Sequence, residues 1–146
     1  MESLRTLYLI DDDTDDLDFF CEAVNTIDQK IICFKSSDSA SALKAFQNHD
    51  VPMPDIIFLD LNMPLVDGRT FLAELKKVGA YADVPVIIYS TSANQRDVEE
   101  TRLLGAADFL TKPCSQENLV NQLQQILDQY ARAVETVQVI SRQGVN

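Results

Sequence analysis

The sequence predicts one α/β domain in three layers, a doubly wound parallel sheet with helices on both faces. Five short apolar runs alternate along the chain with segments whose apolar residues recur at helical spacing. The runs are continuous rather than alternating, which is typical of strands buried on both faces of a parallel sheet. Each parallel neighbour requires a crossover, and the helix between two strands supplies it.

The first three expected strands are the apolar runs at residues 7–10, 31–34 and 56–59. Pro52 and Pro54 precede the third run, as expected for a loop. Between the runs, apolar residues at i, i+3, i+4 and i+7 indicate one buried stripe per helix. These stripes consist of Leu17, Phe20, Cys21, Val24 and Ile27, and of Ala40, Leu43 and Phe46.

The last two expected strands lie at residues 86–89 and 107–110. A helix with an apolar stripe at 71–78 precedes them, and a less clearly amphipathic helix at 94–104 connects them. The final helix is the longest, at about residues 115–138. We therefore assign residues 1–138 to the domain and residues 139–146 to a flexible C-terminal tail.

Composition and charge narrow the function classes. The chain has 146 residues, of which 46% are hydrophobic, enough for one domain with its own core. A formal net charge of -11 argues against binding to nucleic acid or to an anionic membrane surface. The run at 7–10 is too short for a signal sequence or a membrane span. Cys21, Cys33 and Cys114 form no metal-ligand pattern, and we expect reduced thiols in a cytoplasmic protein.

Carboxylates gather where the first and third expected strands end. Asp11 and Asp12 follow the first run directly, and Asp60 follows the third. Open α/β sheets bind ligands at this edge, so the three carboxylates converge if the two strands are neighbours. Like charges in one pocket need a counter-ion, and oxygen ligands suit Mg²⁺. The remaining acids of the first run are interpreted as a solvated surface: Asp13, Asp15, Asp16 and Asp18.

Two more polar side chains are expected at the same edge of the sheet. Ser90 ends the fourth strand, and Lys112 follows the fifth. Alone, Ser90 would be a turn or N-cap residue and Lys112 a solvated surface charge. Together with the carboxylates they supply a hydroxyl donor and an ammonium beside a metal site, which are the parts of a phosphoryl-transfer site.

Three motifs in combination resemble the receiver domain of two-component response regulators, of the stand-alone, chemotaxis-regulator-like type. They are the acidic pair within residues 9–13, the segment 60–68 and the lysine-proline motif within 109–113. The resemblance extends from about residue 4 to residue 127. It implies a flavodoxin-like (βα)5 fold whose parallel five-stranded sheet has the order 2-1-3-4-5.

The resemblance also implies roles for the acidic residues. Asp60 would accept a phosphoryl group from the phosphohistidine of a sensor histidine kinase or a phosphotransfer protein. Asp12, Asp60 and the backbone carbonyl of Asn62 would ligate Mg²⁺, and Asp11 would hold a metal-bound water. Such a domain is a phosphoacceptor in a phosphorelay, not an enzyme that acts on other substrates.

Three further residues would complete the site and its switch. Lys112 would pair with the phosphoryl oxygens, and Ser90 would hydrogen-bond one of them. Phe109 occupies the aromatic switch position, and the family often has a cis peptide bond before the residue that corresponds to Pro113. Phosphorylation would then alter contacts with a downstream protein target. A homodimer through the face of the fourth helix, fifth strand and fifth helix is a second expected contact.

Four other functions compete with this interpretation. An EF-hand calcium loop would have ligands with the spacing of Asp11, Asp13, Asp15 and Glu22, but Asp16 stands where that loop needs glycine. The acidic run would repel the phosphate of a flavin mononucleotide cofactor. An aspartyl phosphatase needs an acid where this chain has Asn62. A receiver-like module that binds partners without phosphorylation would have no need of the whole set of site residues.

Overall fold

The computed structural model describes the backbone of residues 4–144 and the side chains of residues 4–131. Within this part the sheet has five strands, all parallel, in the order β2-β1-β3-β4-β5, which confirms the predicted fold class and strand order. The elements are β1 (Thr6–Ile10), α1 (Thr14–Ile27), β2 (Ile32–Ser36), α2 (Ser39–Gln47), β3 (Ile56–Leu59), α3 (Gly68–Lys76), a short 3-10 helix (Gly79–Tyr81), β4 (Val86–Ser90), α4 (Gln95–Leu103), β5 (Asp108–Thr111) and α5 (Gln116–Gly144).

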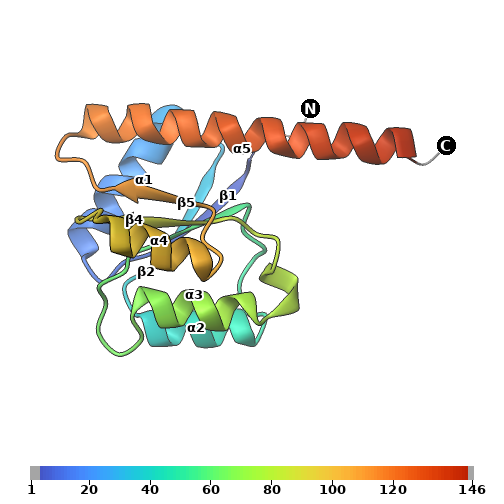
Figure 1. Ribbon diagram of the computed structural model, residues 1–146. Helices are drawn as coiled ribbons and strands as arrows, with labels where there is room; N and C mark the ends of the chain where they lie inside the picture. The colour runs from blue at the N-terminus through green and yellow to red at the C-terminus, as the bar shows by residue number, and fades with distance from the viewer. Residues whose placement is uncertain (1–3, 145–146) are drawn as a thin grey trace.

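Helices cover both faces of the sheet (Figure 1). α1 and α5 pack together on one face, where Phe20 of α1 meets Phe58 of β3 with ring centroids 4.8 Å apart. α2 and α3 cover the other face, and Phe46 and Phe71 belong to the core on that side. The apolar stripes of the helices therefore face the sheet, as their spacing predicts.

The strands are not equally buried. β1, β3 and β4 are central, and the residues of β3 and β4 are buried throughout. β2 and β5 are edge strands whose residues are mostly half-buried or exposed, and Ile32 is 56% exposed. The expectation that every strand is buried on both faces is therefore wrong for the two edges, because an edge strand has a neighbour on one side only.

α5 is longer than the sequence predicts. Its backbone continues to Gly144, six residues past the expected end at about residue 138. No proline and no earlier glycine interrupts it, which explains why the helix does not stop where the clear apolar stripe ends. Residues 145–146 of the expected tail lie outside the described part of the chain. Among the described helices, none is both long and apolar enough to cross a membrane.

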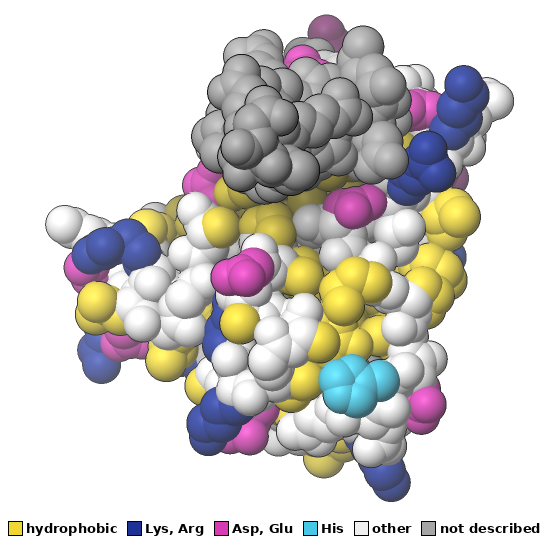
Figure 2. Space-filling view, turned by 90° about the vertical axis from the view of Figure 1, so that its right-hand side faces the viewer, with side chains coloured by type: hydrophobic (Ala, Val, Ile, Leu, Met, Phe, Trp, Pro, Cys, Tyr) yellow, Lys and Arg dark blue, Asp and Glu magenta, His cyan; other side chains and the backbone are white. Residues whose placement is uncertain are grey.

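The two ends of the sheet carry different side chains. Figure 2 views the end at which the strands begin, where hydrophobic side chains lie between scattered acidic and basic ones. His49 is exposed on this face and stacks on Tyr81, with ring centroids 6.1 Å apart. The candidate site residues follow the opposite ends of the strands, so this face is not part of the site.

A glycine allows α3 to start directly against the loop that follows β3. A Cβ atom at Gly68 would lie 2.3 Å from the backbone oxygen of Asp60 and 2.7 Å from the Cα atom of Leu61. The N–H of Gly68 donates to the backbone oxygen of Leu61 at 2.8 Å. Asp67 caps the helix by accepting a hydrogen bond from the N–H of Thr70. This close approach holds the backbone at Asp60 in place.

Gly68→Ala is expected to lower the free energy of unfolding by roughly 1–3 kcal/mol, because the added methyl group meets backbone atoms. Gly79→Ala is the matched control, since nothing lies within 4 Å of a Cβ atom there. Urea unfolding measures both changes. Equal unfolding free energies for the two variants would contradict this account of the loop.

Candidate functional site

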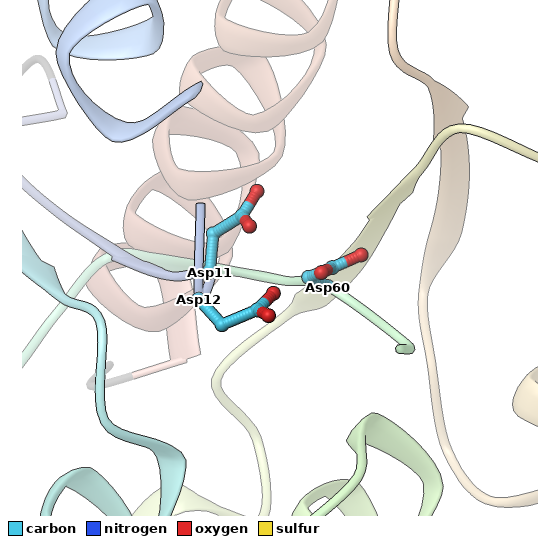
Figure 3. A group of neighbouring side chains, drawn as sticks. All are labelled: Asp11, Asp12 and Asp60. Atoms are coloured by element: carbon cyan, nitrogen blue, oxygen red, sulfur yellow. The ribbon is translucent and has the colours of Figure 1, made fainter. Parts of the chain in front are cut away.

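The carboxylates of Asp11, Asp12 and Asp60 lie close together at the carboxyl end of the sheet (Figure 3). β1 and β3 are paired neighbours, and the N–H of Asp60 donates to the backbone oxygen of Ile10 at 3.0 Å. One oxygen of each carboxylate lies within 4.8 Å of the others. Asp11 and Asp60 are buried, whereas Asp12 is exposed. The predicted meeting of the three carboxylates is confirmed.

Lys112 brings a positive charge into this group. Its Nζ atom lies 2.7 Å from Oδ2 of Asp11, 2.8 Å from Oδ2 of Asp16 and 3.8 Å from Oδ1 of Asp60. The side chain is only 9% exposed, and Nζ lies 5.4 Å from the centroid of the Tyr89 ring. Lys112 is therefore not the solvated surface charge that it would be without the carboxylates.

Asp16 belongs to the site, contrary to the expectation that it lies on the solvated surface. It lies in the first turn of α1, and the N-cap Asp13 holds that turn by accepting hydrogen bonds from the N–H groups of Asp15 and Asp16. This geometry brings the Asp16 carboxylate to Lys112, which is 96 residues away in the sequence. No local pattern indicates a pair so distant along the chain. The assignment of Asp16 to the solvated surface is therefore wrong.

Crowding and burial perturb the titration of this site. Burial, and then the Asp11 carboxylate, raise the pKa of Asp60 to about 7. Burial also raises the pKa of Asp11, against the opposing effect of Lys112. Burial acts to lower the pKa of Lys112, but its contacts with Asp11 and Asp16 outweigh this effect and raise it. The single ammonium of Lys112 therefore does not neutralise the carboxylates of Asp11, Asp12 and Asp60. Carboxylate oxygens are hard ligands, so this group is consistent with binding of a divalent cation.

The other predicted residues lie around the same edge. Ser90 is fully buried at the end of β4, and its Oγ atom accepts a 3.4 Å hydrogen bond from the backbone two residues on. Asn62 is exposed in the loop after β3. Phe109 of β5 is half-buried and lines a surface cavity of about 270 Å³ beside α4. The peptide bond before Pro113 is trans, as are the other described peptide bonds.

Fold and site together define a doubly wound α/β domain with an acidic site at the carboxyl edge of its sheet, and comparison with known families identifies its class. The response regulator receiver domain family matches residues 7–124, and the chain belongs to this family. The function of the family is to take a phosphoryl group on an aspartate within a phosphorelay. Members are signalling domains that interact with histidine kinases and downstream targets.

Similar proteins include response regulators of which the match covers most of the length. Response regulator Rcp1 of Synechocystis sp. is 32% identical over 126 residues, which cover 84% of this chain and 86% of Rcp1. The crystal structure of the Mn²⁺-bound form of Rcp1 aligns with a TM-score of 0.70 and 30% identity, over 87% of this chain and 94% of the other. The structure of the phosphorylated cyanobacterial phytochrome response regulator RcpA aligns with a TM-score of 0.75 and 26% identity, over 85% and 91% of the two chains.

The raised pKa of Asp60 makes the stability of the metal-free protein depend on pH. Folding raises this pKa from 3.8 to about 7, so between these values the folded state keeps a proton that the unfolded state has released. The contribution of Asp60 to the unfolding free energy therefore falls as pH rises through this interval. The Asp60→Asn variant has no titrating carboxyl group at this position. Its unfolding free energy minus that of the wild type should therefore increase by a few kcal/mol as pH rises from about 4 to about 7.

Urea unfolding of both proteins in the presence of a chelator, at several pH values from about 4 to about 8, measures this difference. Asp15→Asn is the control, because Asp15 is exposed in the first turn of α1 and outside the carboxylate group. A stability difference between wild type and Asp60→Asn that stays constant with pH would contradict the raised pKa.

Proposed function

We propose that this chain is a single-domain response regulator that accepts a phosphoryl group on Asp60 from a phosphohistidine of a sensor histidine kinase or phosphotransfer protein. The observation that carries the proposal is the position of the Asp60 carboxylate, between two other carboxylates and the ammonium of Lys112. An oxygen of Asp60 forms a bond to phosphorus while the phosphorus–nitrogen bond of the donor breaks, and the nitrogen keeps the electron pair. The product is an aspartyl phosphate.

Mg²⁺ is the proposed cofactor of this transfer. The carboxylates of Asp12 and Asp60 and the backbone carbonyl of Asn62 would hold the ion, and Asp11 would hold one of its waters. The bound ion would neutralise the carboxylates and the charge on the transferring oxygens. The convergence of three carboxylates supports this assignment, as does the Mn²⁺-bound form of the relative Rcp1.

Lys112 and Ser90 are proposed to act on the phosphoryl group itself. The ammonium of Lys112, 3.8 Å from Asp60, pairs with phosphoryl oxygens in a charge-assisted hydrogen bond. The hydroxyl of Ser90, at the end of the neighbouring strand β4, donates to another phosphoryl oxygen. Phe109, on β5, follows the movement of Ser90 as the aromatic switch. The charge of the phosphoryl group on Asp60 thus changes the surface around Phe109.

The output of the switch is a change in protein contacts. The face formed by α4, β5 and α5 changes its affinity for a downstream protein target, or for a second copy of the chain. The cavity beside Phe109 supports this choice, because it lies between α4 and β5. We place the protein in the cytoplasm, the typical location of receiver domains, and assign it no catalysis beyond its own phosphorylation and dephosphorylation.

Intact mass after incubation with Mg²⁺ and acetyl phosphate tests the proposal. The wild type should gain one phosphoryl group, only when Mg²⁺ is present, and Asp60→Asn should gain none. Asp15→Asn should be phosphorylated like the wild type, since Asp15 is exposed on α1. A wild type that gains nothing under any condition would instead support a receiver-like module that binds partners without phosphorylation.

Asp16→Asn should raise the phosphorylated fraction at limiting acetyl phosphate. Asp16 competes with the phosphoryl group for Lys112, and a partly exposed ion pair contributes about 1 kcal/mol, or roughly fivefold in an equilibrium. Asp15→Asn again serves as the control, because it removes the same charge from the same helical turn without touching Lys112. If the two variants reach the same phosphorylated fraction, Asp16 does not restrain Lys112.

A further inference from the structure

Two cysteines that are separated in the sequence meet beneath α1. The sulfur atoms of Cys21 on α1 and Cys33 on β2 lie 2.8 Å apart. Both are free, half-buried thiols, whereas Cys114 is exposed after β5. We propose that Cys21 and Cys33 are a redox-active dithiol, which a peroxide converts to a disulfide that ties α1 to β2. This site is independent of the phosphoacceptor function.

Contacts between α1 and β2 hold the sulfur atoms of Cys21 and Cys33 close together. Cys33 pairs with Leu7 of β1 and packs against the core on the face that α1 covers. An ion pair of 2.6 Å between Lys35 of β2 and Asp18 of α1 joins the same strand and the same helix. A disulfide bond of about 2.05 Å requires the sulfur atoms to approach by less than about 1 Å more. The two sulfur atoms are therefore already close to bonding distance in the folded protein.

The environment of the pair makes the two thiols unequal. A hydrogen bond with Cys33 lowers the pKa of Cys21, and the charge of Lys35 acts in the same direction, against the effect of burial. The same hydrogen bond, with burial, raises the pKa of Cys33. The thiolate is the reactive form of a cysteine. Cys21 is therefore the attacking residue, and Cys33 resolves the product.

The oxidation proceeds in two steps. The Cys21 thiolate attacks one oxygen of hydrogen peroxide, the oxygen–oxygen bond breaks, and hydroxide leaves, which takes up the proton that the thiol released. The Cys33 sulfur then attacks the sulfur of the Cys21 sulfenic acid, the sulfur–oxygen bond breaks, and water leaves with the Cys33 proton. In total the protein loses two hydrogen atoms and one peroxide becomes two waters. A dithiol such as dithiothreitol returns both thiols.

Intact mass and a peptide map of the folded protein test the inference. After brief treatment with hydrogen peroxide, the wild type should lose two hydrogen atoms and regain them with dithiothreitol. Digestion with trypsin without reductant should release peptides 6–30 and 31–35 joined to each other, because trypsin cuts after Arg5, Lys30 and Lys35 and so places the two cysteines on different peptides. In the Cys33→Ser variant the oxidation should stop at the sulfenic acid of Cys21, which is detected by its covalent reaction with a 1,3-dione reagent. Cys114→Ser is the matched control and should behave like the wild type.

Two results would overturn the inference. One is a folded, peroxide-treated wild type in which peptides 6–30 and 31–35 stay separate. The other is a Cys21→Ser variant that still loses two hydrogen atoms within one chain. The peptide map uses the wild type, so it decides the question even if a serine variant does not fold.

Discussion

The electrostatic crowding around Asp60 is the constraint on which the rest of the structure depends. The carboxylates of Asp11 and Asp12 each have an oxygen within 4.8 Å of an Asp60 oxygen. The ammonium of Lys112 is shared by Asp11, Asp16 and Asp60. Burial makes an uncompensated charge unfavourable, and for this reason the pKa of Asp60 is raised. Such a site has a negative charge in excess, so it favours added positive charge, and it places a nucleophilic carboxylate where a cation and a phosphoryl group can share it.

Strand pairing, the two hydrophobic cores and the starts of two helices hold the crowded carboxylates together. The central strands β1 and β3 pair with each other, which brings their ends to one point, and the cores on both faces of the sheet hold them there. Gly68 lets α3 begin against the backbone of Asp60, and the N-cap Asp13 starts α1 beside Asp11. Stability supplied by the hydrophobic core thus offsets the electrostatic cost of the site.

Features that depend on neighbouring residues could be predicted from the sequence, whereas contacts between distant segments could not. The meeting of Asp11, Asp12 and Asp60 could be predicted because these acids come at the end of an apolar run, and runs of this kind end where a strand ends. The pairs Asp16–Lys112 and Cys21–Cys33 could not, because they depend on how α1 lies over the sheet. The exposure of β2 and β5 also escaped prediction, since an apolar run does not reveal whether a strand is central or at an edge.

The stability of the protein as a function of Mg²⁺ concentration tests the central claim most directly. If the crowded carboxylates form a cation site, the unfolding free energy of the wild type at a pH above about 7 should rise with the logarithm of Mg²⁺ concentration. Asp12→Asn, which keeps the buried pair of Asp11 and Asp60 but removes one proposed ligand, should respond much less. An unfolding free energy of the wild type that is the same without Mg²⁺ and at millimolar Mg²⁺ would contradict the account.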